Sequence, residues 1–183
     1  MSPLHELPPG CRRVALTEEV LQARIAELGA EITAHHAGHP VRLVTVLRGG
    51  LFFLADLCRH IDLDIALDFM AVAPYVQGAG GVVRVTKDLD DSVAGARVIL
   101  VEDVVDTGLT VNYVLNFLRT HNPESVEVCA LLDKHARRIA PVPVTYTGFK
   151  MSDRFLVGYG LDLAGRYRNL PYIAELEEHV ALG

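Results

Sequence analysis

The sequence predicts an α/β fold in a single domain spanning residues 1–183, with a mostly parallel sheet flanked by helices. Three observations carry this prediction. The chain has 183 residues, the usual length of one domain. Short β-branched runs alternate along it with segments whose apolar residues recur at helical spacing. Polar loops directly follow several strand-like runs, and ligands of such sheets bind beyond the carboxyl ends of the strands.

The N-terminal part predicts an irregular segment followed by a long helix. Residues 1–15 are expected to be irregular because three prolines fall before residue 10. Thr17 can cap a helix that begins with Glu18 and Glu19, two acids placed well for the positive helix end. Apolar residues then recur at helical spacing as far as the His39-Pro40 pair, where proline ends the helix.

The remaining elements follow from shorter patterns. Two more helices are expected, over residues 51–59 and from Leu109 to the Asn122-Pro123 pair. The glycine-rich residues 77–81 predict a flexible loop, and an irregular tail is expected at the end of the chain. The strand-like segments share β-branched or aromatic residues between turns, and they are residues 41–47, 65–72, 82–86, 97–101, 126–132, 142–147 and 155–158.

Composition excludes several classes of protein. The formal net charge is −6, which argues against broad binding of nucleic acid or of anionic membranes. The three cysteines are far apart, so neither a disulfide framework nor a zinc site is expected, and the eight histidines show no metal-ligand spacing. No signal peptide and no apolar run of membrane-spanning length is present. We therefore expect a cytoplasmic protein that does not bind a membrane.

Residues 102–110 follow a buried strand and open a helix, and they carry the chemistry. Two hydroxyls, a glycine and several backbone N–H groups at a helix N-terminus form a pocket for a terminal phosphate. Neither a Walker A loop nor a GxGxxG fingerprint is present. The adjacent Glu102 and Asp103 would repel a phosphate unless they bind hydroxyls or act through a divalent cation such as Mg²⁺, and a ribose phosphate meets both needs. Alternatively, Thr107 is an ordinary N-cap and the acids only complement the helix dipole.

Several motifs in a characteristic order resemble the type I phosphoribosyltransferases, and in particular their bacterial hypoxanthine-using members. Residues 98–110 resemble the phosphoribosyl-pyrophosphate signature of that family. The similarity runs from about Leu16 to Ile173. The other matching segments are residues 46–50, 68–71, 87–90, 131–134, 155–162 and 166–172.

The resemblance implies an enzyme of purine salvage with the family's fold, including a small hood formed by the chain ends. It implies Mg²⁺-dependent transfer of 5-phosphoribosyl from phosphoribosyl pyrophosphate to N9 of hypoxanthine, and of guanine. The products are IMP or GMP and pyrophosphate. It also implies a homodimer or homotetramer.

Roles for individual residues come from the same resemblance. Asp106 matches the catalytic acid that faces N7 of the purine. The ribose and 5′-phosphate would be bound by Glu102, Asp103, Thr107, Gly108, Leu109 and Thr110. The pyrophosphate would be bound by Leu47, Arg48, Gly49 and Arg168, with a cis peptide implied between Leu47 and Arg48. The metal would be held at Glu102, Asp103 and Asp162.

The purine site implied by the resemblance lies late in the chain. Lys134 would donate to O6 of the base, so a 6-oxopurine is accepted and a 6-aminopurine is rejected. Phe155 would stack on the ring, and the carbonyl of Leu156 would meet N1 or the 2-position. Asp162 matches an acid beside the purine and the second Mg²⁺. Without the resemblance, Lys134 reads as a surface lysine and Phe155 as core packing.

One motif departs from the family. Residues 74–81 match a mobile lid that usually reads Ser-Ser-Tyr-Gly, whereas this chain has Ala73-Pro74-Tyr75-Val76. Tyr75 is kept, but Pro74 has no N–H to donate. We therefore expect the lid to close differently from that of its relatives.

Three alternatives compete with this hypothesis. A sister enzyme could use xanthine, adenine or a pyrimidine, although Lys134 with Phe155 favours a 6-oxopurine. An RNA-binding regulator built on the same fold would need a basic face, which the net charge opposes. A receiver module phosphorylated on Asp103 or Asp106 is the third, and the following Thr-Gly-Leu-Thr segment favours bound phosphate instead.

Overall fold

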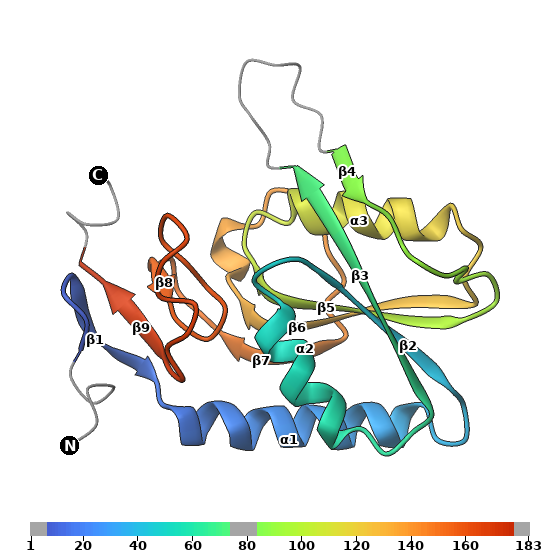
Figure 1. Ribbon diagram of the computed structural model, residues 1–183, viewed down its shortest axis with the longest axis horizontal. Helices are drawn as coiled ribbons and strands as arrows, with labels where there is room; N and C mark the ends of the chain where they lie inside the picture. Colours follow the sequence, from blue (N-terminus) through green and yellow to red (C-terminus); the bar gives the residue numbers. More distant parts are fainter. Residues whose placement is uncertain (1–6, 74–83, 178–183) are drawn as a thin grey trace.

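A computed structural model describes residues 7–73 and 84–177 (Figure 1). Its main sheet has six strands, all parallel except β4, which runs antiparallel to β3. This is the α/β fold class that the sequence predicts. From one edge to the other, the strands are β4 (Arg84–Lys87), β3 (Ile65–Ala73), β2 (Val41–Val46), β5 (Arg97–Val105), β6 (Ser125–Asp133) and β7 (Tyr146–Lys150).

Helices cover both faces of this sheet. Helices α1 (Glu18–His35) and α2 (Leu51–Leu57) lie on one face, and a 3₁₀ turn, η2 (Cys58–His60), extends α2. Helix α3 (Leu109–Arg119) covers the other face. A second 3₁₀ turn, η3 (His135–Arg137), follows β6.

Alternation along the central strands divides the core into two layers. Successive strand side chains point to opposite faces. Leu43 and Ile99 accordingly pack in the cluster under α1 and α2, whereas their neighbours Val44 and Leu100 pack in the cluster under α3. Both layers are closed to water, which explains why the middle of each of these strands is apolar on both faces.

A second, antiparallel sheet forms the hood that the resemblance implied. It contains β1 (Cys11–Leu16), β9 (Ile173–Leu176) and β8 (Leu156–Val157), with β9 in the middle. The prediction of an irregular segment before residue 16 and of an irregular tail was therefore wrong. These strands pair across the length of the chain, and β1 carries no alternating apolar pattern that would reveal it.

The strand predicted over residues 142–147 begins only at Tyr146. Pro141 and Pro143 have no N–H to contribute to a ladder, so pairing with β6 starts after them. The strand predicted over residues 155–158 is reduced to Leu156–Val157. Gly158 follows with φ of +99°, a conformation that leaves the extended region.

Candidate active site

The carboxyl ends of β2, β5 and β6 meet at one edge of the main sheet, as expected for parallel neighbours. The peptide bond between Leu47 and Arg48, just after β2, is cis, as the resemblance implied. A side chain at Gly49 would collide with the carboxylate of Asp103, and one at Gly160 would collide with the carbonyl of Gly49. Glycine at these two positions therefore brings the loop after β2, the end of β5 and the hood into contact.

The segment after β5 forms a turn that opens α3. Gly108 is the N-cap residue with φ of +81°, where a side chain would also meet the carbonyl of Ala140. The backbone N–H groups of Ile139 and Ala140 donate to the carbonyl of Thr107 at 2.8 and 3.0 Å. The turn is therefore fixed by the loop after β6. The N–H of Leu109, the first residue of α3, makes only a long 3.5 Å hydrogen bond to Oγ1 of Thr107, so an anion at this helix end can compete for it.

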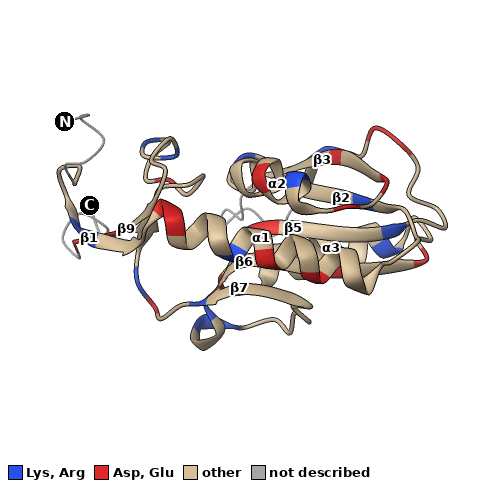
Figure 2. Ribbon diagram, turned by 90° about the horizontal axis from the view of Figure 1, so that it is seen from below, with Lys and Arg blue, Asp and Glu red and all other residues tan. Residues whose placement is uncertain are grey.

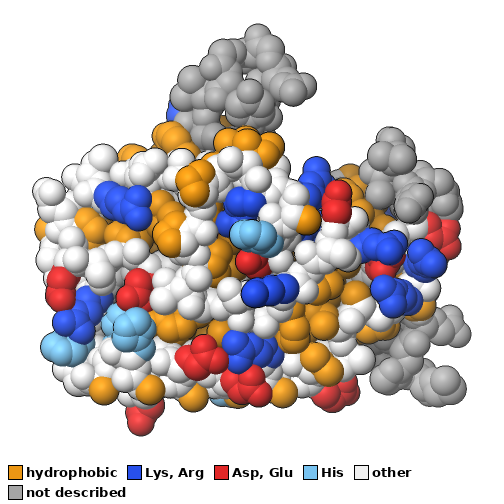
Figure 3. Space-filling model, turned by 180° about the vertical axis from the view of Figure 1, so that it is seen from behind, with side chains coloured by type: hydrophobic (Ala, Val, Ile, Leu, Met, Phe, Trp, Pro, Cys, Tyr) orange, Lys and Arg blue, Asp and Glu red, His pale blue; other side chains and the backbone are white. Residues whose placement is uncertain are grey.

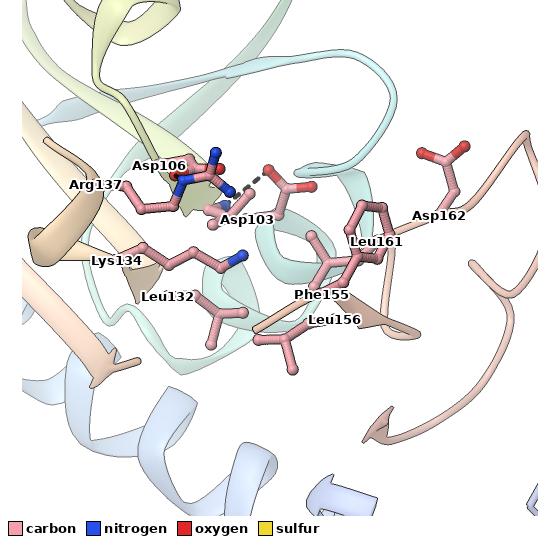
Figure 4. Close-up of a pocket in the computed structure, with 10 residues that line it drawn as sticks. Asp103, Asp106, Leu132, Lys134, Arg137, Phe155, Leu156, Leu161 and Asp162 are labelled. Atoms are coloured by element: carbon pink, nitrogen blue, oxygen red, sulfur yellow. Dashed lines mark hydrogen bonds and ion pairs between the residues drawn. The ribbon is translucent and has the colours of Figure 1, made fainter. Parts of the chain in front are cut away.

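A cavity of about 270 Å³ lies beside this turn, near the lower end of the range for small-ligand sites (Figure 4). Polar residues from the ends of β5 and β6 form one side, and apolar residues from the hood form the other. Its lining residues are Asp103, Val104, Asp106, Leu132, Lys134, Arg137, Phe155, Leu156, Leu161 and Asp162. Six residues that the sequence analysis assigned to ligands therefore share one cavity: Asp103, Asp106, Lys134, Phe155, Leu156 and Asp162.

Other predicted site residues lie around the cavity rather than in its lining. Arg168 donates to the carbonyl of Gly160 at 2.5 Å and pairs with Asp162 at 2.6 Å, so it braces the hood loop. The remaining ones outside the lining that the structure describes are Leu47, Arg48, Gly49, Glu102, Thr107, Gly108, Leu109 and Thr110. The predicted lid, residues 74–81 with Tyr75, lies outside the described residues.

Arg137 is a site residue that the sequence analysis missed. Its guanidinium lies 3.2 Å from the carboxylate of Asp106 and 3.1 Å from that of Asp153. The loop that contains it follows a buried strand, so its position was a usable signal. Its pairing with Asp106 could not be predicted from the sequence, because that contact depends on the short η3 turn that brings the side chain back over the cavity.

Lys134 lies at the end of β6 and is only 8% exposed. Its ammonium group donates to the backbone carbonyl of Arg154 at 2.6 Å, which directs it across the cavity toward the hood (Figure 4). Burial lowers the pKa of Lys134, and the nearby charge of Asp106 opposes that change. Lys134 is therefore a fixed hydrogen-bond donor facing the ligand space, and not the surface lysine that its sequence context alone suggested.

Two adjacent acids, Glu102 and Asp103, lie in the second half of β5. Burial raises the pKa of Glu102 well above its ordinary value, and the charge of Asp103 adds to that effect. Burial also raises the pKa of Asp103, although the N–H of Val104, 2.8 Å away, works in the other direction. Oε1 of Glu102 has no hydrogen-bond partner among the described residues. A buried carboxylate oxygen without a hydrogen-bond partner lowers the stability of the fold unless a ligand or a cation binds it.

This oxygen donor set fits Mg²⁺. The ion prefers oxygen ligands and is commonly held by one or two carboxylates together with the phosphates of a substrate. Asp103 faces the cavity, Asp162 lies at its hood side, and Glu102, next to Asp103 in the chain, has an unsatisfied oxygen. The residues present are therefore compatible with a magnesium ion that arrives with a phosphorylated substrate.

Charge is mixed over the rest of the molecule. Figure 2 shows acidic and basic residues interspersed along the elements, and Figure 3 shows the same mixture over one whole face. No uniformly basic surface of the kind that nucleic-acid binding requires is visible on that face. In the part of the chain that the structure describes, no helix has the length and apolar character needed to cross a membrane.

Comparison with known proteins identifies the family. Residues 16–163 match the phosphoribosyl transferase domain. The chain therefore belongs to the phosphoribosyltransferase family.

Individual relatives are similar over nearly their whole length. The chain is 47% identical to the hypoxanthine-guanine phosphoribosyltransferase of Mycobacterium avium, covering 96% of this chain and 91% of that one. It is 43% identical to the hypoxanthine phosphoribosyltransferase of Escherichia coli K12, covering 89% and 94%. A crystal structure of a hypoxanthine phosphoribosyltransferase from Staphylococcus aureus matches with a TM-score of 0.90 and 40% identity, covering 93% and 94%.

Proposed function

We propose that this chain transfers the 5-phosphoribosyl group of phosphoribosyl pyrophosphate to N9 of hypoxanthine, and of guanine, in purine salvage. The observation that carries the proposal is the cavity that joins Asp106 and Lys134 to Phe155 beside a helix N-terminus. Its relatives at 42–47% identity with hypoxanthine in their names support the choice of base.

The polar and apolar walls of the cavity suit a flat base with a 6-oxo group. Phe155, 42% exposed, offers a ring face on which the base stacks, and Leu156 and Leu161 extend the apolar wall. Lys134 keeps its bond to the carbonyl of Arg154 and donates to O6 through another N–H of its ammonium group. A 6-amino group would place donor against donor there, which is the physical reason to expect rejection of adenine.

In the reaction, N9 of the base attacks C1′ of the ribose while the bond from C1′ to the pyrophosphate oxygen breaks, and pyrophosphate leaves with that electron pair. Asp106 accepts the proton from N7 as the positive charge of the base develops. Arg137, 3.2 Å from Asp106, must turn aside for the base to reach this carboxylate. General-base assistance of this kind contributes about 10²- to 10⁴-fold to the rate.

The other end of the substrate is held by backbone. N–H groups at the start of α3 receive the 5′-phosphate, with the hydroxyls of Thr107 and Thr110 beside them. Glu102 and Asp103 accept from the ribose hydroxyls. The loop of Leu47, Arg48 and Gly49, with Arg168, holds the pyrophosphate. A bound Mg²⁺ would supply positive charge that neutralises the pyrophosphate, and Asp103, Asp162 and Glu102 would hold it.

We also propose that the chain works as a homodimer or homotetramer in the cytoplasm. Its three cysteines, Cys11, Cys58 and Cys129, are unpaired, as a reducing compartment requires. Light scattering coupled to size exclusion measures the assembly directly, and a monomer at micromolar concentration would contradict it.

The decisive experiment measures nucleotide formation from phosphoribosyl pyrophosphate and Mg²⁺ with hypoxanthine, guanine, xanthine and adenine in parallel. We expect fast formation of IMP, formation of GMP, and no AMP. Omitting Mg²⁺ should abolish turnover. Formation of AMP would contradict the role of Lys134, and absence of any nucleotide would contradict the proposed reaction.

A further inference from the structure

A cluster of metal-ligating side chains lies at the opposite edge of the main sheet from the cavity. His35 and His36 end helix α1, Glu127 is near the start of β6, and Tyr146 is the first residue of β7. Strand β6 runs from this cluster to the cavity. Asp133 lies six positions after Glu127, which places the two sites roughly 20 Å apart along the strand.

Four donor atoms of this cluster converge. The hydroxyl of Tyr146 lies 2.6 Å from Nδ1 of His35, 3.2 Å from Nε2 of His36 and 2.8 Å from Oε2 of Glu127. Oε2 of Glu127 lies 3.2 Å from Nε2 of His36 and 4.0 Å from Nδ1 of His35. The ligand atoms of the two histidines and the glutamate all lie within 4.8 Å of one another.

These separations match the geometry of a tetrahedral metal ion. Bonds of about 2.0–2.1 Å from zinc to nitrogen and oxygen place neighbouring donors roughly 3.3–3.4 Å apart. Two of the separations are 3.2 Å, and the others lie on both sides of the ideal value. Small rotations of the side chains therefore suffice to equalise them. Imidazole nitrogen and carboxylate oxygen are also the usual zinc ligands of enzymes.

The surroundings favour a bound cation. His36 is only 4% exposed and is held between α1 and the sheet, while His35 lies at the surface and leaves an entry path. Helix α1 is 18 residues long and ends at His35, so its negative dipole end points at the cluster. The only basic residue in its last turn is His35, and His36 is the C-cap; both histidines bind metals in their neutral form.

We propose that His35, His36 and Glu127, with the hydroxyl of Tyr146 as a fourth donor, bind one divalent transition-metal ion of the zinc type. The ion replaces the hydrogen bonds that now join these groups, and the proton that Tyr146 now donates to Glu127 is released to water on coordination. The ion ties the end of α1 to β6 and β7, whose ligands lie 91 and 110 residues from His36 in the sequence. The site is structural, and it is independent of the magnesium that the proposed reaction needs.

Zinc binding to the purified full-length protein tests the proposal. Isothermal titration with Zn²⁺, in excess Mg²⁺ to occupy the active-site carboxylates, should give one tight equivalent for the wild type. His35→Ala and Glu127→Gln should each weaken that affinity at least tenfold. His121→Gln, which changes a histidine at the end of α3, is the matched control and should bind like the wild type. His35 is partly exposed, so His35→Ala should fold normally.

Two further readouts separate this site from the active site. Co²⁺ in place of Zn²⁺ should give the intense visible absorption of tetrahedral coordination in the wild type, and not in His35→Ala. Asp103→Asn should keep the tight equivalent, while His35→Ala should keep the phosphoribosyl transfer of the wild type. Zinc affinity equal in wild type and both cluster variants would overturn the proposal, as would loss of the tight equivalent in Asp103→Asn alone.

Discussion

Two buried glutamates lie in opposite environments within this molecule. Glu175, in the middle strand of the hood, is 3% exposed and contacts Arg13, Arg154 and Arg12 at 2.9, 3.0 and 3.8 Å. Glu102, in the second half of β5, is also buried at 7% exposed, and no basic side chain pairs with it among the described residues.

The presence or absence of basic partners distinguishes an acid that stabilises the fold, Glu175, from one that we expect to bind a ligand, Glu102. Burial alone would raise the pKa of Glu175, but the hydrogen bond from Arg13 and the charges of the three arginines lower it. Burial raises the pKa of Glu102 without such compensation. Uncompensated burial of charge costs stability, and it persists where function uses it. A mutation of Glu102 should therefore lower activity but not stability, whereas a mutation of Glu175 should lower stability but not activity.

The largest effect should come from the functional side of this comparison. Asp106→Asn removes the carboxylate that accepts the N7 proton, so kcat should fall about 10²- to 10⁴-fold with little change in KM. Steady-state kinetics with hypoxanthine measures both. Asp153→Asn is the control, since Asp153 also pairs with Arg137 but lies outside the cavity lining. An unchanged kcat would remove Asp106 from the catalytic role.

Glu102→Gln should make the protein more stable and less active. The neutral amide needs no compensating charge, so the free energy of unfolding at pH 7 should rise by about 1 kcal/mol. Transfer activity should fall at least tenfold, because the amide cannot replace the carboxylate toward ribose hydroxyls and Mg²⁺. Urea unfolding and kinetics on the same preparation check both effects. A variant that loses stability would place Glu102 in the same class as Glu175.

Glu175→Gln should show the reverse pattern. Removing the charge leaves three arginines without their partner, and the protein should lose about 1–2 kcal/mol of stability, a modest value because those arginines remain in contact with water. The folded enzyme should keep most of its kcat. Loss of activity at full stability would show that the hood acid takes part in function.

The smallest effect is a pH dependence of the hood. The pKa of Glu175 is lower in the folded protein than its ordinary value of 4.5, so the unfolded chain takes up the proton first. Its stabilising contribution is complete above pH 4.5 and is lost as the pH falls through the lower folded value. The stability difference between wild type and Glu175→Gln should therefore shrink from pH 5 to pH 3. A constant difference would contradict this assignment.

Local patterns were sufficient to predict most of the main sheet. The apolar run at Arg97–Val101 and the helical spacing after Glu18 are patterns in which several neighbouring residues all indicate the same buried element. Both elements are present, as β5 and α1. Strands β1 and β9 escaped prediction because each depends on the other, and neither has a periodic apolar pattern. Proline at residues 141 and 143 shifted β7 for a reason that the sequence did contain.

The candidate site divides in the same way. Asp106 and Lys134 follow buried strands directly, so their place at the carboxyl edge was predictable from chain order. The contact of Arg137 with Asp106 was not, because it depends on the path of a short turn. The cluster of His35, His36 and Glu127 was missed for a related reason: the glutamate is 91 residues away from His36, and only the packing of α1 against the sheet brings them together.

The pairing of β1 with β9 has a consequence for how the chain is made. The register joins Leu16 to Ile173 and Cys11 to Leu176. Strand β1, the first to leave the ribosome, therefore cannot pair until β9, the last strand, has been synthesised. The main sheet, complete at Lys150, can fold meanwhile. The apolar wall of the cavity, which includes Phe155 and Leu161, emerges only after that sheet. During synthesis, the edge of the main sheet with Asp103 and Asp106 therefore emerges before the apolar wall against which a base would pack. The cavity is the last part of the molecule to be completed.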